Sequence, residues 1–125
     1  MDKEESFKNI IKSNNHYFCV SHFNGDIDWI CDKNKTEYIV YNKSGRKLSK
    51  KINHINIKNV GYNLYSYLKF IIDNYYNLPN TIVFCKDNIF TRHITYNLFK
   101  EYLKSNNFTC IEEKTYIQIT IKLKL

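Results

Sequence analysis

The segment from residue 59 to residue 88 constrains the fold most strongly, because it predicts a helix followed by a buried strand. The helix carries apolar residues on one side and polar residues on the other. We expect its core-facing side to hold Leu64, Leu68, Ile71, Ile72 and Tyr75, with Lys69, Asp73 and Asn74 facing away. Pro79 ends the helix, since proline disfavours helical backbone at the preceding residue. TIVFC, residues 81–85, is a near-continuous apolar run and predicts a strand covered on both faces.

Further strands and helices are predicted on either side of this segment. β-branched and aromatic residues or apolar alternation predict strands at residues 16–23, 36–42, 109–113 and 114–125. Residues 43–58 are interpreted as a polar connection. Helical spacing predicts an N-terminal helix with Phe7, Ile10 and Ile11 inward, a short helix within residues 26–32, and a helix from about Thr91 with Ile94, Leu98, Tyr102 and Leu103 inward.

Strands separated by helices predict a largely parallel sheet, because parallel strands need crossover connections. The last predicted strand alternates apolar and polar residues, which indicates one buried face and an antiparallel C-terminal edge. We therefore expect residues 1–125 to form a single α/β domain. It would be a three-layer, Rossmann-like sandwich with TIVFC as a central parallel strand.

The net charge of +7 is weak evidence for nucleic-acid binding. Arg46 and Arg92 are the only arginines, although arginine is the side chain best suited to grip phosphates with two parallel hydrogen bonds. The lysines are spread along the chain, apart from a short basic run at residues 44–51. This pattern favours a solubilising surface, so nucleic acid is not the expected partner.

The four cysteines form no C-x-x-C pair, and three of them fall within predicted strands. We interpret them as structural thiols of a reduced protein. No apolar run has the length of a membrane span, and the first fifteen residues lack the apolar core of a signal peptide. We expect a soluble, cytoplasmic protein with no membrane partner.

Short polar segments follow the predicted strands, and ligands of open α/β sheets bind beyond the carboxyl ends of the strands. The candidate ligand-binding residues are Ser21, His22, Asn24, Asn42, Lys43, Lys86, Asp87 and Asn88. Asn59 and Gly61 join them because they open the helix that leads into TIVFC. These residues predict a polar cleft for a phosphate-bearing or sugar-bearing ligand, with Lys86, Asp87 and Asn88 beside Ser21 to Asn24.

Two stretches resemble a family of α/β proteins known as domain of unknown function 3431. The first reads N-V-G-x-x-x-x-S-Y-L-x-x-I-I-D-N-Y-x-N-L-P-N-x-x-V-F at residues 59–84. The second reads V-S-H-F-N-G-D-I-D-W-I at residues 20–30, followed by Y-I-V-Y-N-K at residues 38–43. Together they span most of residues 18–90. The chain departs from the family pattern at His22, at Tyr62 and Asn63, and at Lys86 and Asp87.

That family in turn looks like the nucleotide-sugar half of an A-type-fold glycosyltransferase, in which an acidic motif after a strand holds a divalent cation. This resemblance implies a nucleotide-sugar ligand, catalytic roles for His22 and Asp87, and a Mn²⁺ or Mg²⁺ ion on Asp87 with Asn88 beside it. Alternatively, Lys86, Lys43 and His22 would contact the diphosphate directly. The runner-up is a non-catalytic interaction module on the same fold, and a basic nucleic-acid binder comes third.

Each candidate residue also has a structural interpretation. His22 would be a hydrogen-bonded residue at a strand end, and Asp87 with Asn88 would cap the helix predicted near Thr91. Asn59 and Gly61 would cap and turn the chain into the following helix. The final strand offers an edge for pairing across a two-fold axis, so a homo-oligomer remains open.

Overall fold

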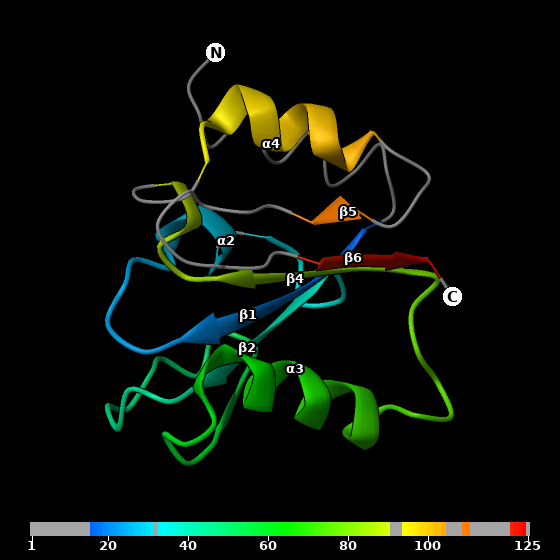
Figure 1. Ribbon diagram of the computed structural model, residues 1–125. Coiled ribbons are helices and arrows are strands. Elements are labelled where there is room, and N and C mark those ends of the chain that lie inside the picture. The colour runs from blue at the N-terminus through cyan, green and yellow to red at the C-terminus, as the bar shows by residue number, and fades with distance from the viewer. Residues whose placement is uncertain (1–15, 32, 91–93, 105–108, 111–120, 125) are drawn as a thin grey trace.

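One mixed sheet of six strands, in the order β3-β2-β1-β4-β6-β5, organises the described part of the chain (Figure 1). The computed structural model describes residues 16–31, 33–90, 94–104, 109–110 and 121–124. The strands are β1 (Tyr17–His22), β2 (Tyr38–Asn42), β3 (His54–Asn56), β4 (Thr81–Lys86), β5 (Thr109–Cys110) and β6 (Ile121–Lys124). The helices are α2 (Asp28–Cys31), α3 (Tyr62–Asp73) and α4 (Tyr96–Leu103). The predicted N-terminal helix lies outside the described residues.

The first four strands are parallel, whereas β6 pairs antiparallel with both β4 and β5. β4 lies between β1 and β6, and its residues Ile82 to Cys85 are at most 1% exposed. A strand with neighbours on both edges and helices on both faces has no polar side, which accounts for its apolar run. The structure confirms the predicted α/β fold and its mainly parallel sheet with an antiparallel C-terminal edge.

The sheet forms the middle of three layers, with α2 and α4 on one face and α3 on the other (Figure 1). Alternate residues along the strands divide the core into two clusters, as a period of two requires. Phe18, Val20, Val83 and Cys85 face α2 and α4, whose Ile30, Phe99 and Leu103 complete the first cluster. Cys19, Tyr41, Ile82 and Phe84 face α3, whose Tyr67 and Phe70 complete the second.

The face that α3 buries is not the one predicted. Ser66, Tyr67 and Phe70 are buried, whereas Leu64, Leu68, Ile72 and Tyr75 are exposed and only Ile71 packs partly against the core. This helix carries apolar or aromatic residues on most of its own sides, so the spacing of apolar residues alone could not identify the buried side. The chosen side carries two aromatic rings, and Phe70 contacts the rings of Tyr17, Tyr41 and Phe84. Aromatic rings bury large apolar areas, which favours this orientation.

Two further sequence predictions are wrong. The predicted polar connection at residues 43–58 contains β3, a three-residue strand at the edge of the sheet. Its side chains are partly buried or exposed and mix polar and apolar types, so the sequence gives little indication of a strand there. On α4, Leu98 is 47% exposed, and Phe99 is buried instead. α4 begins at Tyr96 because Thr95 caps it, its hydroxyl accepting a hydrogen bond from the amide of Leu98 at 3.2 Å.

The described helices are all short. α3 is the longest, with 12 residues, and α4 has eight. None of the helices in the parts of the chain listed above has both the length and the apolar character needed to cross a membrane.

Candidate functional site

A His–Asp pair stands at the carboxyl edge of the sheet, between β1 and β4. The parallel register pairs Val20 with Cys85 and Ser21 with Lys86, so His22 and Asp87 leave the sheet side by side. The Asp87 amide extends the ladder by donating to the Ser21 carbonyl oxygen at 3.0 Å. The structure thus brings the polar ends of these two strands together, which is where open α/β sheets bind ligands.

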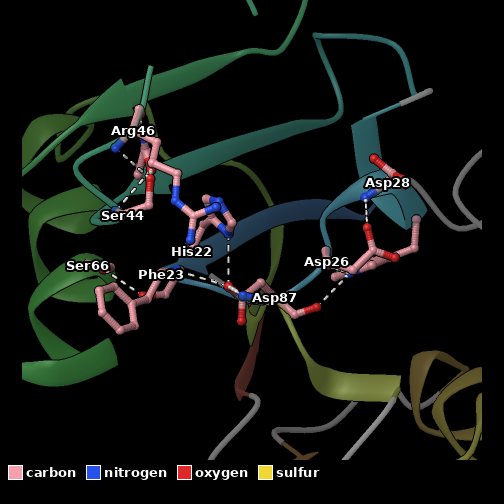
Figure 2. A network of polar contacts seen from close by, with 12 residues as sticks. His22, Phe23, Asp26, Asp28, Ser44, Arg46, Ser66 and Asp87 are labelled. Carbon is pink, nitrogen blue, oxygen red and sulfur yellow. Dashed lines mark hydrogen bonds and ion pairs between the residues drawn. The ribbon is translucent and has the colours of Figure 1, made fainter. Parts of the chain in front are cut away.

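A single carboxylate oxygen of Asp87 accepts three hydrogen bonds (Figure 2). Oδ2 lies 2.8 Å from Nδ1 of His22, 2.9 Å from the amide nitrogen of Phe23 and 2.8 Å from the amide nitrogen of Gly25. Asp87 is only 5% exposed, so these bonds replace lost hydration. The loop after β1 therefore wraps around the carboxylate and fixes it.

Gly25 makes this close wrapping possible. A Cβ atom built at Gly25 would lie 2.5 Å from Oδ1 and 2.6 Å from Cγ of Asp87, which is closer than real Cβ contacts. The Asp87 side chain cannot swing away without breaking its bonds to His22 and the loop. Glycine is thus required at position 25 for close approach.

Opposing effects act on the pKa of Asp87. Burial raises it, but the hydrogen bonds from His22 and from the Phe23 and Gly25 amides lower it by more, so the net pKa is lowered. Asp87 is therefore ionised at neutral pH. The indole of Trp29 adds a further restraint, because its Nε1 donates to the Asp87 carbonyl oxygen at 2.9 Å.

An ionised Asp87 fixes the tautomer of His22. A carboxylate only accepts hydrogen bonds, so Nδ1 of His22 carries a proton, and in the neutral form of the ring Nε2 has the lone pair. Nε2 makes no hydrogen bond to any residue that the structure describes, and His22 is 8% exposed. An imidazole oriented by a carboxylate with one nitrogen available is the arrangement of a general base.

A second polar group, the Asn42–Lys43 cluster, follows β2 at the same edge. The Asn42 amide nitrogen donates to the Arg46 carbonyl oxygen at 2.8 Å and to Oδ1 of Asn56 at 2.9 Å. Its oxygen accepts from the Ser44 amide at 3.1 Å and from the Ser44 hydroxyl at 2.6 Å. Asn42 is 2% exposed and folds the loop after β2.

Lys43 is also occupied by the backbone. Its ammonium group donates to the carbonyl oxygens of Val60, at 2.8 Å, and Tyr62. Burial lowers its pKa. Lys43 thus holds the turn that leads into α3, and most of its donor capacity is used there.

The remaining predicted site residues belong neither to the His22–Asp87 pair nor to the Asn42–Lys43 cluster. Asn24 and Asn59 are exposed, while Lys86 and Asn88 are partly buried beside Asp87 in sequence. The Ser21 hydroxyl lies 2.8 Å from the Ser66 hydroxyl and joins β1 to α3. Gly61 has φ of 67° and precedes α3, where a Cβ would lie 2.7 Å from Cβ of Tyr65, so its role is conformational.

Gly25, Trp29 and Arg46 also lie at this edge, although none of them was predicted to belong to the site. Asn24-Gly25 is a common turn sequence and Trp29 is a large apolar residue, so neither carries a local signal of a ligand site. Arg46 carried a signal that could have found it, since it is one of only two arginines in a lysine-rich chain. Figure 2 shows its side chain extending toward His22.

The divalent cation implied by the resemblance does not fit Asp87. Oδ2 already accepts three hydrogen bonds, and Oδ1 lies against Gly25. Mn²⁺ and Mg²⁺ take several oxygen ligands, yet no group of three or more His, Cys, Asp or Glu side chains gathers within the described ranges. Asp87 accepts a hydrogen bond from the His22 ring instead.

Two of the described cysteines, Cys19 and Cys85, do not add a nucleophile. Cys19 and Cys85 are free and fully buried in the core, and Cys31 is partly buried. Burial raises the pKa of Cys19 and of Cys85, which keeps both thiols protonated and unreactive. This agrees with the structural role predicted for these residues.

The fold and the pair define a three-layer α/β protein with a carboxylate-oriented histidine at the carboxyl edge of its sheet. A family model described as "Protein of unknown function (DUF3431)" matches residues 19–125, and the chain belongs to that family. This confirms the resemblance seen in the sequence. No curated protein and no solved structure matches the chain, so the likeness to A-type glycosyltransferases stays a prediction.

Proposed function

We propose that this chain is a small transferase-like enzyme in which His22 is the general base and Asp87 positions it. The hydrogen bond of 2.8 Å between Nδ1 of His22 and Oδ2 of Asp87 carries this proposal. The two amide bonds to the same oxygen support it, since they hold the carboxylate that orients the ring. The ligand class is a nucleotide sugar, in line with the polar residues at this edge and with the family's likeness to glycosyltransferases.

The chemistry follows from the free Nε2 atom. His22 would take the proton of an acceptor hydroxyl or of water at Nε2 while the oxygen attacks the anomeric carbon. The bond from that carbon to the diphosphate oxygen breaks, and the nucleoside diphosphate leaves with the electron pair. Asp87 stabilises the imidazolium that forms and stays ionised itself, as its lowered pKa favours.

A panel of UDP-sugars and GDP-sugars tests the proposal, with release of nucleoside diphosphate as the measured rate and calorimetry for binding. We expect His22→Gln to lower the rate by about 10²-fold or more while binding remains, because general-base catalysis contributes roughly that factor. We expect Asp87→Asn to lower it as well, since an amide at this position can favour the wrong tautomer. His54→Gln is the matched control, because His54 is a partly buried histidine on the edge strand β3.

Each reaction is run with manganese and with EDTA. Equal rates in both would agree with the poor fit of a cation to Asp87. A rate that needs manganese and is abolished in Asp87→Asn would restore the metal interpretation. An unchanged rate in His22→Gln would remove the general base, and a panel with neither binding nor release by the wild type would sink the enzyme proposal.

The exposed apolar face of α3 supports a second candidate, a non-catalytic interaction module that pairs with a second copy of the chain. Leu64, Leu68, Ile72 and Tyr75 lie at helical spacing, and Ile72 is 73% exposed. A continuous apolar patch on a surface commonly marks an interaction site. Light scattering should then give about twice the chain mass of 15.1 kDa. Leu68→Glu with Ile72→Glu should return a single chain mass, and a wild type that is already a single chain would exclude this self-association.

A further inference from the structure

We infer that Arg46 binds a phosphate group of the ligand beside His22. The inference rests on the proposed function, because it places that group next to the proposed base. It adds a specific residue, since the sequence assigned phosphate contacts only to lysines and to His22.

The loop after β2 holds the Arg46 backbone at a fixed place. The Asn42 side chain donates to the Arg46 carbonyl oxygen at 2.8 Å, and the Arg46 amide donates to the Ser44 hydroxyl at 3.0 Å. Gly45 has φ of 74°, a left-handed conformation that suits glycine and reverses the chain between Ser44 and Arg46. The backbone is therefore tied down on both sides of the side chain.

This place is next to His22. The parallel register of β1 and β2 pairs His22 with Asn42, and the Lys43 amide donates to the His22 carbonyl oxygen at 2.7 Å. The Arg46 side chain extends from the loop toward His22 (Figure 2). Asn42 thus links the two residues: it sits beside His22 in the sheet and binds the Arg46 backbone with its side chain.

The guanidinium group is available for a ligand. Arg46 is exposed and forms no ion pair with any residue that the structure describes. Lys43, which directly follows β2, is occupied by the Val60 and Tyr62 carbonyl oxygens. A free guanidinium has five N–H donors in a planar fork that matches two oxygens of a phosphate. Arg46 therefore supplies the anion contact that Lys43 was expected to make.

Inorganic pyrophosphate is the probe that tests the inference, titrated into the full chain by calorimetry. We expect Arg46→Gln to weaken binding about tenfold or more, and Arg46→Lys to weaken it by less, because a lysine keeps the charge but lacks the fork. Lys47→Gln removes a neighbouring exposed charge and should change the affinity by less than about twofold, since exposed charges are screened. Circular dichroism checks folding, and the backbone anchors of Arg46 do not involve its side chain.

Nitrogen NMR of the His22 ring locates the bound group. Pyrophosphate should shift the His22 Nε2 signal in the wild type and leave it in place in Arg46→Gln. Equal affinities of the wild type and Arg46→Gln, or equal losses in Arg46→Gln and Lys47→Gln, would overturn the inference, as would a wild type that does not bind. Pyrophosphate binding that depends on Arg46, without turnover of any nucleotide sugar, would uphold the anion contact and contradict the proposed catalysis instead.

Discussion

The two polar clusters at the carboxyl edge of the sheet use their hydrogen-bonding capacity in opposite ways. In the Asn42–Lys43 cluster, the polar groups are taken up by the loops: Asn42 makes four hydrogen bonds and Lys43 binds two carbonyl oxygens. In the His22–Asp87 pair, three bonds converge on one oxygen and fix an imidazole whose Nε2 stays available. The loops use the polar groups of the Asn42–Lys43 cluster, whereas the His22–Asp87 pair leaves Nε2 of His22 without a hydrogen bond to any described residue.

The difference shows that a polar residue at the carboxyl edge of the sheet is not necessarily available to a ligand. Both clusters follow neighbouring parallel strands, and both were candidates in the sequence. What separates them is the donor or acceptor capacity that remains after the loops have been folded.

Gly25→Ala should cause the largest loss of stability. The added methyl group would lie 2.5 Å from Oδ1 of Asp87, so either the loop or the carboxylate must move and the three bonds to Oδ2 weaken. We expect the free energy of unfolding to fall by about 3 kcal/mol, measured by urea denaturation. Gly45→Ala is the matched control in the other cluster, because its surroundings are open and only its φ of 74° opposes a side chain. It should cost about 1 kcal/mol, and equal losses would mean that Gly25 is not a close-contact position.

Lys43→Met should be the next largest change. It keeps the length of the side chain but leaves the Val60 and Tyr62 carbonyl oxygens without their charged donor. We expect a loss of about 2 kcal/mol in the same assay, the usual range for a hydrogen bond to a charged group. Lys47→Met, an exposed lysine of the same loop, should change stability by less than about 0.5 kcal/mol. If Lys43→Met weakened pyrophosphate binding without affecting stability, its structural role would be refuted.

Acid should weaken the His22–Asp87 pair selectively. The folded-state pKa of Asp87 is lowered, so its ionised form stabilises the fold above the unfolded pKa of about 3.9, and this contribution is lost as the pH falls through the folded value. We expect wild type to be about 1.5 kcal/mol more stable than Asp87→Asn at neutral pH. That gap should shrink below pH 4, measured by denaturation at a series of pH values. A gap that stays constant down to strong acid would contradict the lowered pKa.

Asn59→Ala and Asn24→Ala should have the smallest effects. Both side chains are exposed at this edge. We expect each free energy of unfolding to change by less than about 0.5 kcal/mol. A larger loss would assign the residue to the folded loops, whereas an unchanged stability with weaker nucleotide-sugar binding would assign it to the ligand site.

The sequence predicted the sheet better than the helix faces. TIVFC was recognisable as a central strand because a strand covered on both faces can hold only apolar residues. The inward side of α3 was not, since Leu68 and Phe70 mark different sides of one helix and only the shape of the opposing sheet decides between them. β3 was not predicted, because a strand of three residues of mixed polarity at the edge of a sheet is too short to show an alternating pattern.

The sequence predicted which edge of the sheet holds the candidate residues, but it did not predict how their side chains are arranged. His22 and Asp87 could be placed at one edge because the carboxyl ends of parallel strands meet there. The pairing of His22 with Asp87 depends on the register of β1 with β4, and the position of Arg46 depends on how the Asn42 side chain folds its loop. No short stretch of sequence predicts either of these arrangements. Lys43 and Asp87 looked alike as isolated polar residues, and only their partners separate them.

The long sequence separation within the pair has a consequence for how the molecule folds. His22 and Asp87 are 65 positions apart, whereas β1 and β2 are close in sequence and can pair early. The bonds around Oδ2 can form only when β4 has joined β1, which makes them late events of the folding reaction. In pulse-labelling hydrogen exchange, the Phe23 and Gly25 amides should therefore gain protection after the Val40 amide, which bonds within the β2–β3 region. A folding intermediate in which β4 has not yet joined β1 would therefore lack the hydrogen bond between His22 and Asp87.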